Sequence, residues 1–137
     1  MKSKYKAMVL SCIDPRFQHL VHSFLKKKKL TGKYSAFTIA GAAVGVTHSN
    51  FKKWHNTFYD NLATSIQLHK IEKLIVINHK DCGAAKIVNE KKEFNPENEK
   101  NIHQNSFSKL KKEIKKRFPK LKVELNLIDL DSKVIKF

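Results

Sequence analysis

The sequence lacks, near its start, a hydrophobic run long enough for a signal peptide or a membrane span. Residues 1–6 are polar and basic, and the apolar stretch over residues 7–13 is soon followed by Asp14 and Arg16. A membrane-spanning helix needs about 20 apolar residues, and a secretory signal needs an apolar core free of such early charges. These absences predict a soluble, cytoplasmic protein with no membrane span.

Cysteine and arginine are scarce. The only cysteines are Cys12 and Cys82, and in the cytoplasm two cysteines are more often metal ligands or reactive thiols than a structural disulfide. The only arginines are Arg16 and Arg117, although the formal net charge is +16. Because bidentate recognition of phosphate favours arginine over lysine, a nucleic-acid or anionic-surface partner is possible but not favoured. The charge also suits a solvated, lysine-rich surface.

Repeats and linkers are absent too, so we predict a single domain over residues 1–137. An apolar fraction of 41% with nine phenylalanines argues against disorder. Continuous apolar runs alternate with segments of helical periodicity, which predicts an α/β three-layer sandwich around a central, mostly parallel sheet. Strands are expected at residues 6–13, 34–40, 73–78, 121–128 and, as an edge strand, 134–137. Helices are expected at residues 17–29, 50–69, from 82, and 106–118, with a tight loop at 41–45 and a surface loop at 91–105.

Chemically distinctive residues stand at the ends of three predicted strands. Residues 12–16 end the first strand, the glycine-rich residues 41–45 end the second, and residues 79–83 end the third. Ligands of open parallel sheets bind beyond the carboxyl ends of the strands. If the first and third strands are neighbours, their two clusters meet although they are far apart in the sequence.

The residue types in these clusters suit a zinc ion. Cys12, His79 and Cys82 offer two thiolates and one imidazole, a donor set that leaves a fourth position for water. Asp14 would share a face with Cys12 in an extended segment, so it can be a fourth ligand or accept a proton from the water. Arg16 can clamp the Asp14 carboxylate. The alternatives are that the cysteines are plain core residues and that Asp14 and Arg16 form only a surface ion pair.

These motifs resemble those of β-class carbonic anhydrases. Residues 12–16 are similar to the family's Cys-x-Asp-x-Arg motif, and residues 79–83 to its His-x-x-Cys-Gly motif. Ala40 and Gly41 are similar to the end of its Arg-Asn-Ala-Gly loop. The resemblance implies a sheet of strand order 2-1-3-4, to which a C-terminal edge strand can add, and a homodimer.

The resemblance also implies a reaction, the reversible hydration of carbon dioxide to bicarbonate by a zinc-bound hydroxide. Cys12, His79 and Cys82 would be the zinc ligands, and Asp14 with Arg16 the catalytic dyad. Zinc would bring the pKa of its water to about 7. Arg16 would keep Asp14 ionised and away from the metal.

Substrate binding is expected at Gly41, Ala42 and Gly83, whose loop and backbone N–H groups adjoin the expected metal. Here the sequence departs from the family, since Thr38 and Ile39 replace the Arg-Asn pair of the loop. Three alternatives therefore stay open. They are a zinc hydrolase acting on carbonyl sulfide or carbon disulfide, a non-catalytic zinc domain with a basic surface for an anionic partner, and a dithiol redox role.

Overall fold

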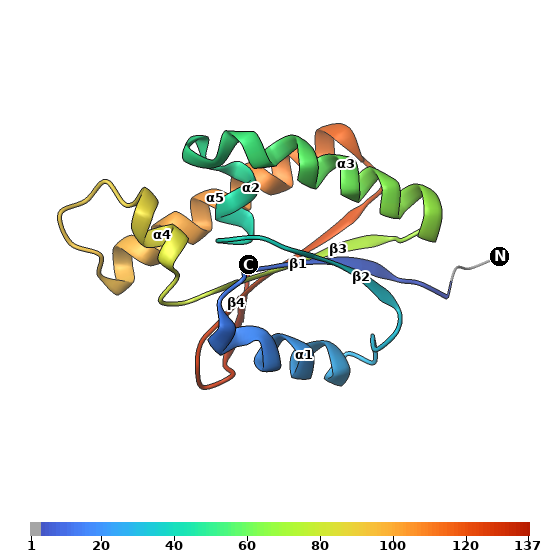
Figure 1. The fold of residues 1–137 in the computed structure, drawn as a ribbon, viewed down its shortest axis with the longest axis horizontal. Coiled ribbons are helices and arrows are strands. Elements are labelled where there is room, and N and C mark those ends of the chain that lie inside the picture. Colours follow the sequence, from blue (N-terminus) through green and yellow to red (C-terminus); the bar gives the residue numbers. More distant parts are fainter. Residues whose placement is uncertain (1–3) are drawn as a thin grey trace.

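The computed structural model describes residues 4–137, which form a five-stranded sheet between two helical layers (Figure 1). The strands run in the spatial order β2-β1-β3-β4-β5; the first four are parallel, and β5 is antiparallel to β4. The predicted α/β class, strand order and C-terminal edge strand are confirmed. The strands are β1 (Ala7–Ser11), β2 (Tyr34–Thr38), β3 (Lys73–His79), β4 (Lys122–Ile128) and β5 (Val134–Lys136).

The helices divide unevenly between the two faces of the sheet. The helix α1 (Gln18–Lys27) lies on one face, whereas α2 (Ala43–Thr47), α3 (Lys52–His69) and α5 (Pro96–Arg117) lie on the other (Figure 1). The short α4 (Gly83–Val88) follows β3 beyond the end of the sheet. Over residues 4–137, no helix combines the length and the apolar character that crossing a membrane requires. The first three residues of the predicted polar start lie outside the described part.

The central strand β3 is buried on both faces, as a parallel strand between helical layers should be. Its side chains alternate: Ile75 and Ile77 join the apolar cluster with α1, whereas Leu74 and Val76 join the larger cluster with α3 and α5. This period of two fixes which helical layer each later side chain of β3 faces.

The predicted surface loop over residues 91–105 is only partly right, because residues 91–95 form a loop but α5 already begins at Pro96. Proline suits the first position of a helix, where its missing N–H has no partner to lose. Asn95 caps the helix by accepting a hydrogen bond from the Asn98 amide at 2.8 Å. Ser106, the first residue of the predicted helix, lies inside α5 and is buried.

The predicted tight loop over residues 41–45 is also partly wrong, because α2 begins within it at Ala43. Gly41 and Ala42 make the turn, with φ of 81° and 49°, and the chain is helical from the next residue. The segment is buried against its neighbours. It therefore holds a fixed position beside the end of β1.

Three elements meet at Glu124, a half-buried carboxylate of β4. Lys73 of β3 and Lys28, at the end of α1, each place their ammonium nitrogen 3.0 Å from one carboxylate oxygen. Burial acts to raise the pKa of Glu124, but the two ion pairs lower it overall. The ionised carboxylate thus ties α1 to the sheet.

Glu124→Gln should lower the free energy of unfolding by about 1 kcal/mol at pH 7, because partly exposed ion pairs are each worth up to about 1 kcal/mol. The pKa of Glu124 is lower in the folded state than in the unfolded state. The stabilisation that the ionised carboxylate gives is therefore fully present above the unfolded pKa of about 4.3, and it is lost as the pH falls through the folded pKa. Urea unfolding at pH 7 and pH 3 measures both effects. The exposed Glu72→Gln is the control, and an equal loss at both pH values would contradict the ion-pair assignment.

Candidate metal centre

The parallel pairing of β1 and β3 brings the two predicted clusters together. Ser11 lies opposite Ile77 in the register, so Cys12 emerges from β1 close to the point where β3 ends at His79. Cys82 follows at the start of α4. The ligand atoms of Cys12, His79 and Cys82 lie within 4.8 Å of one another, and all three residues are buried. The structure thus joins the three side chains that the sequence proposed as ligands.

The ring of His79 is fixed so that one nitrogen faces the cluster. Its Nδ1 lies 2.7 Å from the carbonyl oxygen of Lys80; since a carbonyl only accepts, Nδ1 carries the proton. Phe17 stacks on the ring with centroids 4.0 Å apart. The buried Nε2 has no hydrogen-bond partner among residues 4–137. Buried polar atoms normally have a hydrogen-bond partner. A buried imidazole nitrogen that keeps a free lone pair is therefore suited to be a metal ligand.

The two sulfurs are unequal. Both cysteines are free and buried, and the Gly41 amide donates to Cys12 Sγ at 3.2 Å. A hydrogen bond from the Cys82 thiol, opposed by burial, holds the pKa of Cys12 well below its usual range, and the backbone amides of Gly41 and Asp14 act in the same direction. The same hydrogen bond, together with burial, raises the pKa of Cys82. The hydrogen bond between the two sulfurs thus favours one thiolate in the pair, and the Gly41 amide favours that charge on Cys12.

This donor set fits a zinc ion. Two sulfurs and one neutral imidazole nitrogen are ligands that zinc prefers, and three protein ligands leave a coordination position open. Binding would require Cys82 to lose its proton, as metal binding to thiols generally does. Two thiolates would balance the ionic charge in this buried place. The cluster can thus bind a metal ion.

Asp14 stands beside the cluster and is held by Arg16. The guanidinium donates to the carboxylate from Nε at 3.1 Å and from Nη2 at 2.7 Å, and the Arg16 amide adds a bond of 2.9 Å. The Arg16 hydrogen bonds lower the pKa of Asp14 to about 2. Asp14, with φ of −56° and ψ of 121°, directly precedes a 3₁₀ turn over Pro15–Phe17 and caps it. Its Oδ2 lies 3.8 Å from His79 Nε2.

Arg16 has a second acidic partner, which the sequence analysis missed. Its Nη1 lies 2.9 Å from Oδ2 of Asp81, and its Nη2 donates to the Asp81 carbonyl at 3.0 Å. Asp81 precedes Cys82 in the motif, and that position is the only signal that could have found it. Arg16 thereby joins the two ligand-bearing loops to each other.

Two further missed residues, Glu99 and His103, lie on α5 behind the cluster. Glu99 accepts hydrogen bonds from the amides of Asp81 and Cys82, at 3.0 and 2.9 Å. Because residues 91–105 were predicted to be a surface loop, their spacing of four was not recognised as one face of a helix. That face is buried.

The predicted substrate-binding residues occupy two different environments. Gly41 and Ala42 are buried, and the Gly41 amide is engaged by Cys12 Sγ. Gly83 is exposed at the first position of α4, next to Cys82. Of these three residues, Gly83 is the one that solvent reaches.

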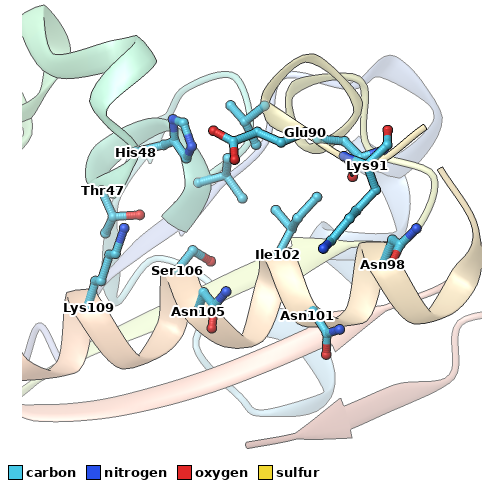
Figure 2. Close-up of a pocket in the computed structure, with 13 residues that line it drawn as sticks. Thr47, His48, Glu90, Lys91, Asn98, Asn101, Ile102, Asn105, Ser106 and Lys109 are labelled. Atoms are coloured by element: carbon cyan, nitrogen blue, oxygen red, sulfur yellow. Dashed lines mark hydrogen bonds between the residues drawn. The ribbon is translucent and has the colours of Figure 1, made fainter. Parts of the chain in front are cut away.

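A cavity of about 260 Å³ lies elsewhere, between α2, α5 and the segment after α4 (Figure 2). His48 and Thr47 border it on one side, Glu90 and Lys91 on the other, and α5 forms its floor. The side chains that line it do not include any of the three candidate ligands. The cavity is therefore separate from the candidate metal centre.

Gly41→Ala should lower the free energy of unfolding by about 3 kcal/mol, since the new Cβ would combine a left-handed backbone with overpacking. At a φ of 81° it would lie 2.8 Å from the Cβ of Ala84. Gly32→Ala is the matched control: φ is 75° and nothing lies within 4 Å, so it should cost about 1 kcal/mol. Urea unfolding of both variants gives the comparison. Equal losses would contradict the close approach.

The fold agrees with comparisons to known proteins. A family model described as "Putative carbonic anhydrase" matches residues 1–135. A protein of Rickettsia bellii (strain RML369-C) with the description "Uncharacterized protein" is 29% identical over 125 residues, which are 90% of this chain and 76% of that protein.

Solved structures of β-carbonic anhydrases share the fold. The β-carbonic anhydrase CcaA superposes with a TM-score of 0.67 at 13% identity, covering 99% of this chain and 81% of its own. A tetrameric β-carbonic anhydrase of Sordaria macrospora gives 0.65 at 11% identity, covering 99% and 82%. Such low identities establish the fold alone. Because the family model matches nearly the whole chain, the protein belongs to the carbonic anhydrase family that this model describes.

Proposed function

We propose that the protein is a zinc-dependent carbonic anhydrase that catalyses the reversible hydration of carbon dioxide to bicarbonate. Cys12, His79 and Cys82 hold the metal in this proposal. The observation that carries it is the convergence of three buried donor atoms within 4.8 Å, one of them a nitrogen that has no hydrogen-bond partner in the described part of the chain. The convergence occurs at the carboxyl ends of the parallel strands, where open α/β sheets bind their ligands.

The residues around the cluster suit this reaction. A bound zinc ion supplies a Lewis acid that makes water nucleophilic near neutral pH. Asp14, with a pKa of about 2, is ionised in that range, so its carboxylate can accept a hydrogen bond from the water and orient it. Arg16 keeps that carboxylate ionised and occupied, and so holds it off the metal position.

Substrate contacts are proposed on the open side of the cluster. Gly83 is exposed beside Cys82, so its backbone N–H can donate to a substrate oxygen. Gly41 and Ala42 act from the buried side: they shape the loop against Cys12, and the Gly41 amide stabilises its thiolate. Carbon dioxide is small and uncharged, so a few backbone donors suffice to orient it.

We also propose a cytoplasmic homodimer. Ile13 is 59% exposed and Ile87 is 68% exposed, and both lie within a few residues of candidate ligands. Burial of these side chains against a second subunit would be favourable, and a solved structure with this fold is described as tetrameric. A second candidate function, a non-catalytic zinc domain that binds an anionic partner, is favoured by the exposed lysines of α5. These are Lys111, Lys112, Lys115 and Lys116.

Metal analysis combined with stopped-flow hydration of carbon dioxide tests the proposal. The wild type should contain about one zinc ion per chain, and Cys82→Ser should lose most of it because only two strong ligands remain. Asp14→Ala should keep the metal and lose activity by a factor of about 100 or more, the usual contribution of a positioned acid–base group. Asp60→Ala, an exposed change on α3, is the control and should keep both.

Two results would count against the catalytic role. A zinc-loaded wild type without hydration between about pH 6.5 and 9, the range around a typical zinc-water pKa, leaves the zinc hydrolase and the non-catalytic domain. Carbonyl sulfide and carbon disulfide are then the substrates to test. Binding to DNA or to acidic vesicles that weakens steeply with salt would support the second candidate.

A further inference from the structure

A network of buried polar side chains lies behind the candidate metal centre, on the α5 side of the sheet. Glu99 and His103 of α5 and Asn78 of β3 are 8%, 0% and 1% exposed. Buried polar groups are costly unless they are hydrogen-bonded. Their role therefore depends on which groups they contact.

At one end of this network, Glu99 holds the turn that carries Cys82. The two carboxylate oxygens of Glu99 accept hydrogen bonds from consecutive backbone amides, Oε1 from Asp81 at 3.0 Å and Oε2 from Cys82 at 2.9 Å. Asp81 has a φ of 57°, a left-handed conformation that is unfavourable for a residue other than glycine. The carboxylate thus stabilises the strained step between His79 and Cys82.

In the middle of the network, only one assignment of donors and acceptors is possible. The amide nitrogen of Asn78 can only donate, so Nδ1 of His103, 2.8 Å away, accepts. The other ring nitrogen of a neutral His103, Nε2, then carries the proton and faces Glu99 Oε2 at 3.3 Å. His103 thus has a single tautomer, and the orientation of Glu99 is fixed by its neighbours.

The other end of the network, at Asn78, contacts the loop beside Cys12. Asn78 Oδ1 accepts a hydrogen bond from the Ala43 amide at 3.0 Å. Two residues earlier, the Gly41 amide donates to Cys12 Sγ at 3.2 Å. One continuous set of hydrogen bonds therefore connects the backbone around both sulfurs.

Helix formation by itself does not explain Glu99. The N-cap of α5 is Asn95, and the amides that donate to the Glu99 carboxylate belong to another loop and not to the start of its own helix. Glu97, two residues earlier, is exposed in the first turn. It offers the same charge without those contacts.

We propose that Glu99 is a positioning residue of the metal centre, held in place by His103 and Asn78, and that it sets the affinity for the metal by orienting the Asp81–Cys82 turn. This inference rests on the proposed zinc site at Cys12, His79 and Cys82. It adds a determinant on α5 that lies outside both sequence motifs. Outer partners of this kind commonly change metal affinity by about 10- to 100-fold.

Glu99→Gln tests the proposal, because glutamine keeps the shape but can accept only one of the two amide hydrogen bonds. The zinc dissociation constant of the full chain, measured by competition with a chelator, should rise about 10- to 100-fold relative to wild type. Glu97→Gln should leave it unchanged. The melting temperature of the metal-free proteins is measured alongside, since a merely structural role would lower that temperature and leave the zinc affinity of the folded protein unchanged.

The outcomes separate the two proposals. A wild type that binds no zinc would overturn the proposed function and this inference with it. A wild type that binds zinc, with Glu99→Gln binding equally well, would overturn the positioning role alone. If Glu99→Gln does not fold, amide hydrogen exchange of the wild type decides: the Asp81 and Cys82 amides should exchange at least about 100-fold more slowly than in an unfolded peptide, and unprotected exchange would overturn the inference.

Discussion

The site depends on the register between β1 and β3. Cys12 can meet His79 and Cys82 only because Ser11 lies opposite Ile77 in a parallel pair. Side chains of a strand alternate between its two faces, so a slip of one residue would exchange the directions of Asn78 and His79. The imidazole would then leave the cluster, and the Asn78 amide would lose its partners on α2 and α5. The apolar clusters on both faces hold the register in place.

Neighbouring side chains of β3 thus perform two different tasks. His79 faces the α1 side, where Phe17 stacks on its ring, and it directs one nitrogen to the cluster. Asn78 faces the α5 side and is fully engaged in hydrogen bonds with His103 and Ala43. Among these buried polar groups, the Nε2 of His79 differs from the others because it has no hydrogen-bond partner within residues 4–137. Exceptions to polar pairing are expected at functional sites.

The supports of the cluster come from elements far apart in the chain. Arg16 joins the Asp14 and Asp81 loops on the open side, where it is partly exposed. Glu99 joins Asp81 and Cys82 to α5 on the buried side. The Asp81–Cys82 turn is therefore held from both sides, which suits a ligand loop that must keep a fixed geometry around an ion. Preorganisation of this kind reduces the reorganisation that metal binding would require.

Local sequence determined the strands and the three candidate ligands, because apolar runs and ligand types are properties of short segments. The strand order followed from the resemblance of the two motifs to those of a known family. Local sequence also indicated the pairing of Asp14 with Arg16, two residues apart. Only the tertiary structure decided the roles of Asp81, Glu99 and His103, since a polar helix such as α5 differs little from a loop until its buried face meets a partner. The φ of Asp81 likewise depends on contacts that no single segment contains, whereas the start of α5 at Pro96 has a local signal in the Asn95 cap and the proline that follows it.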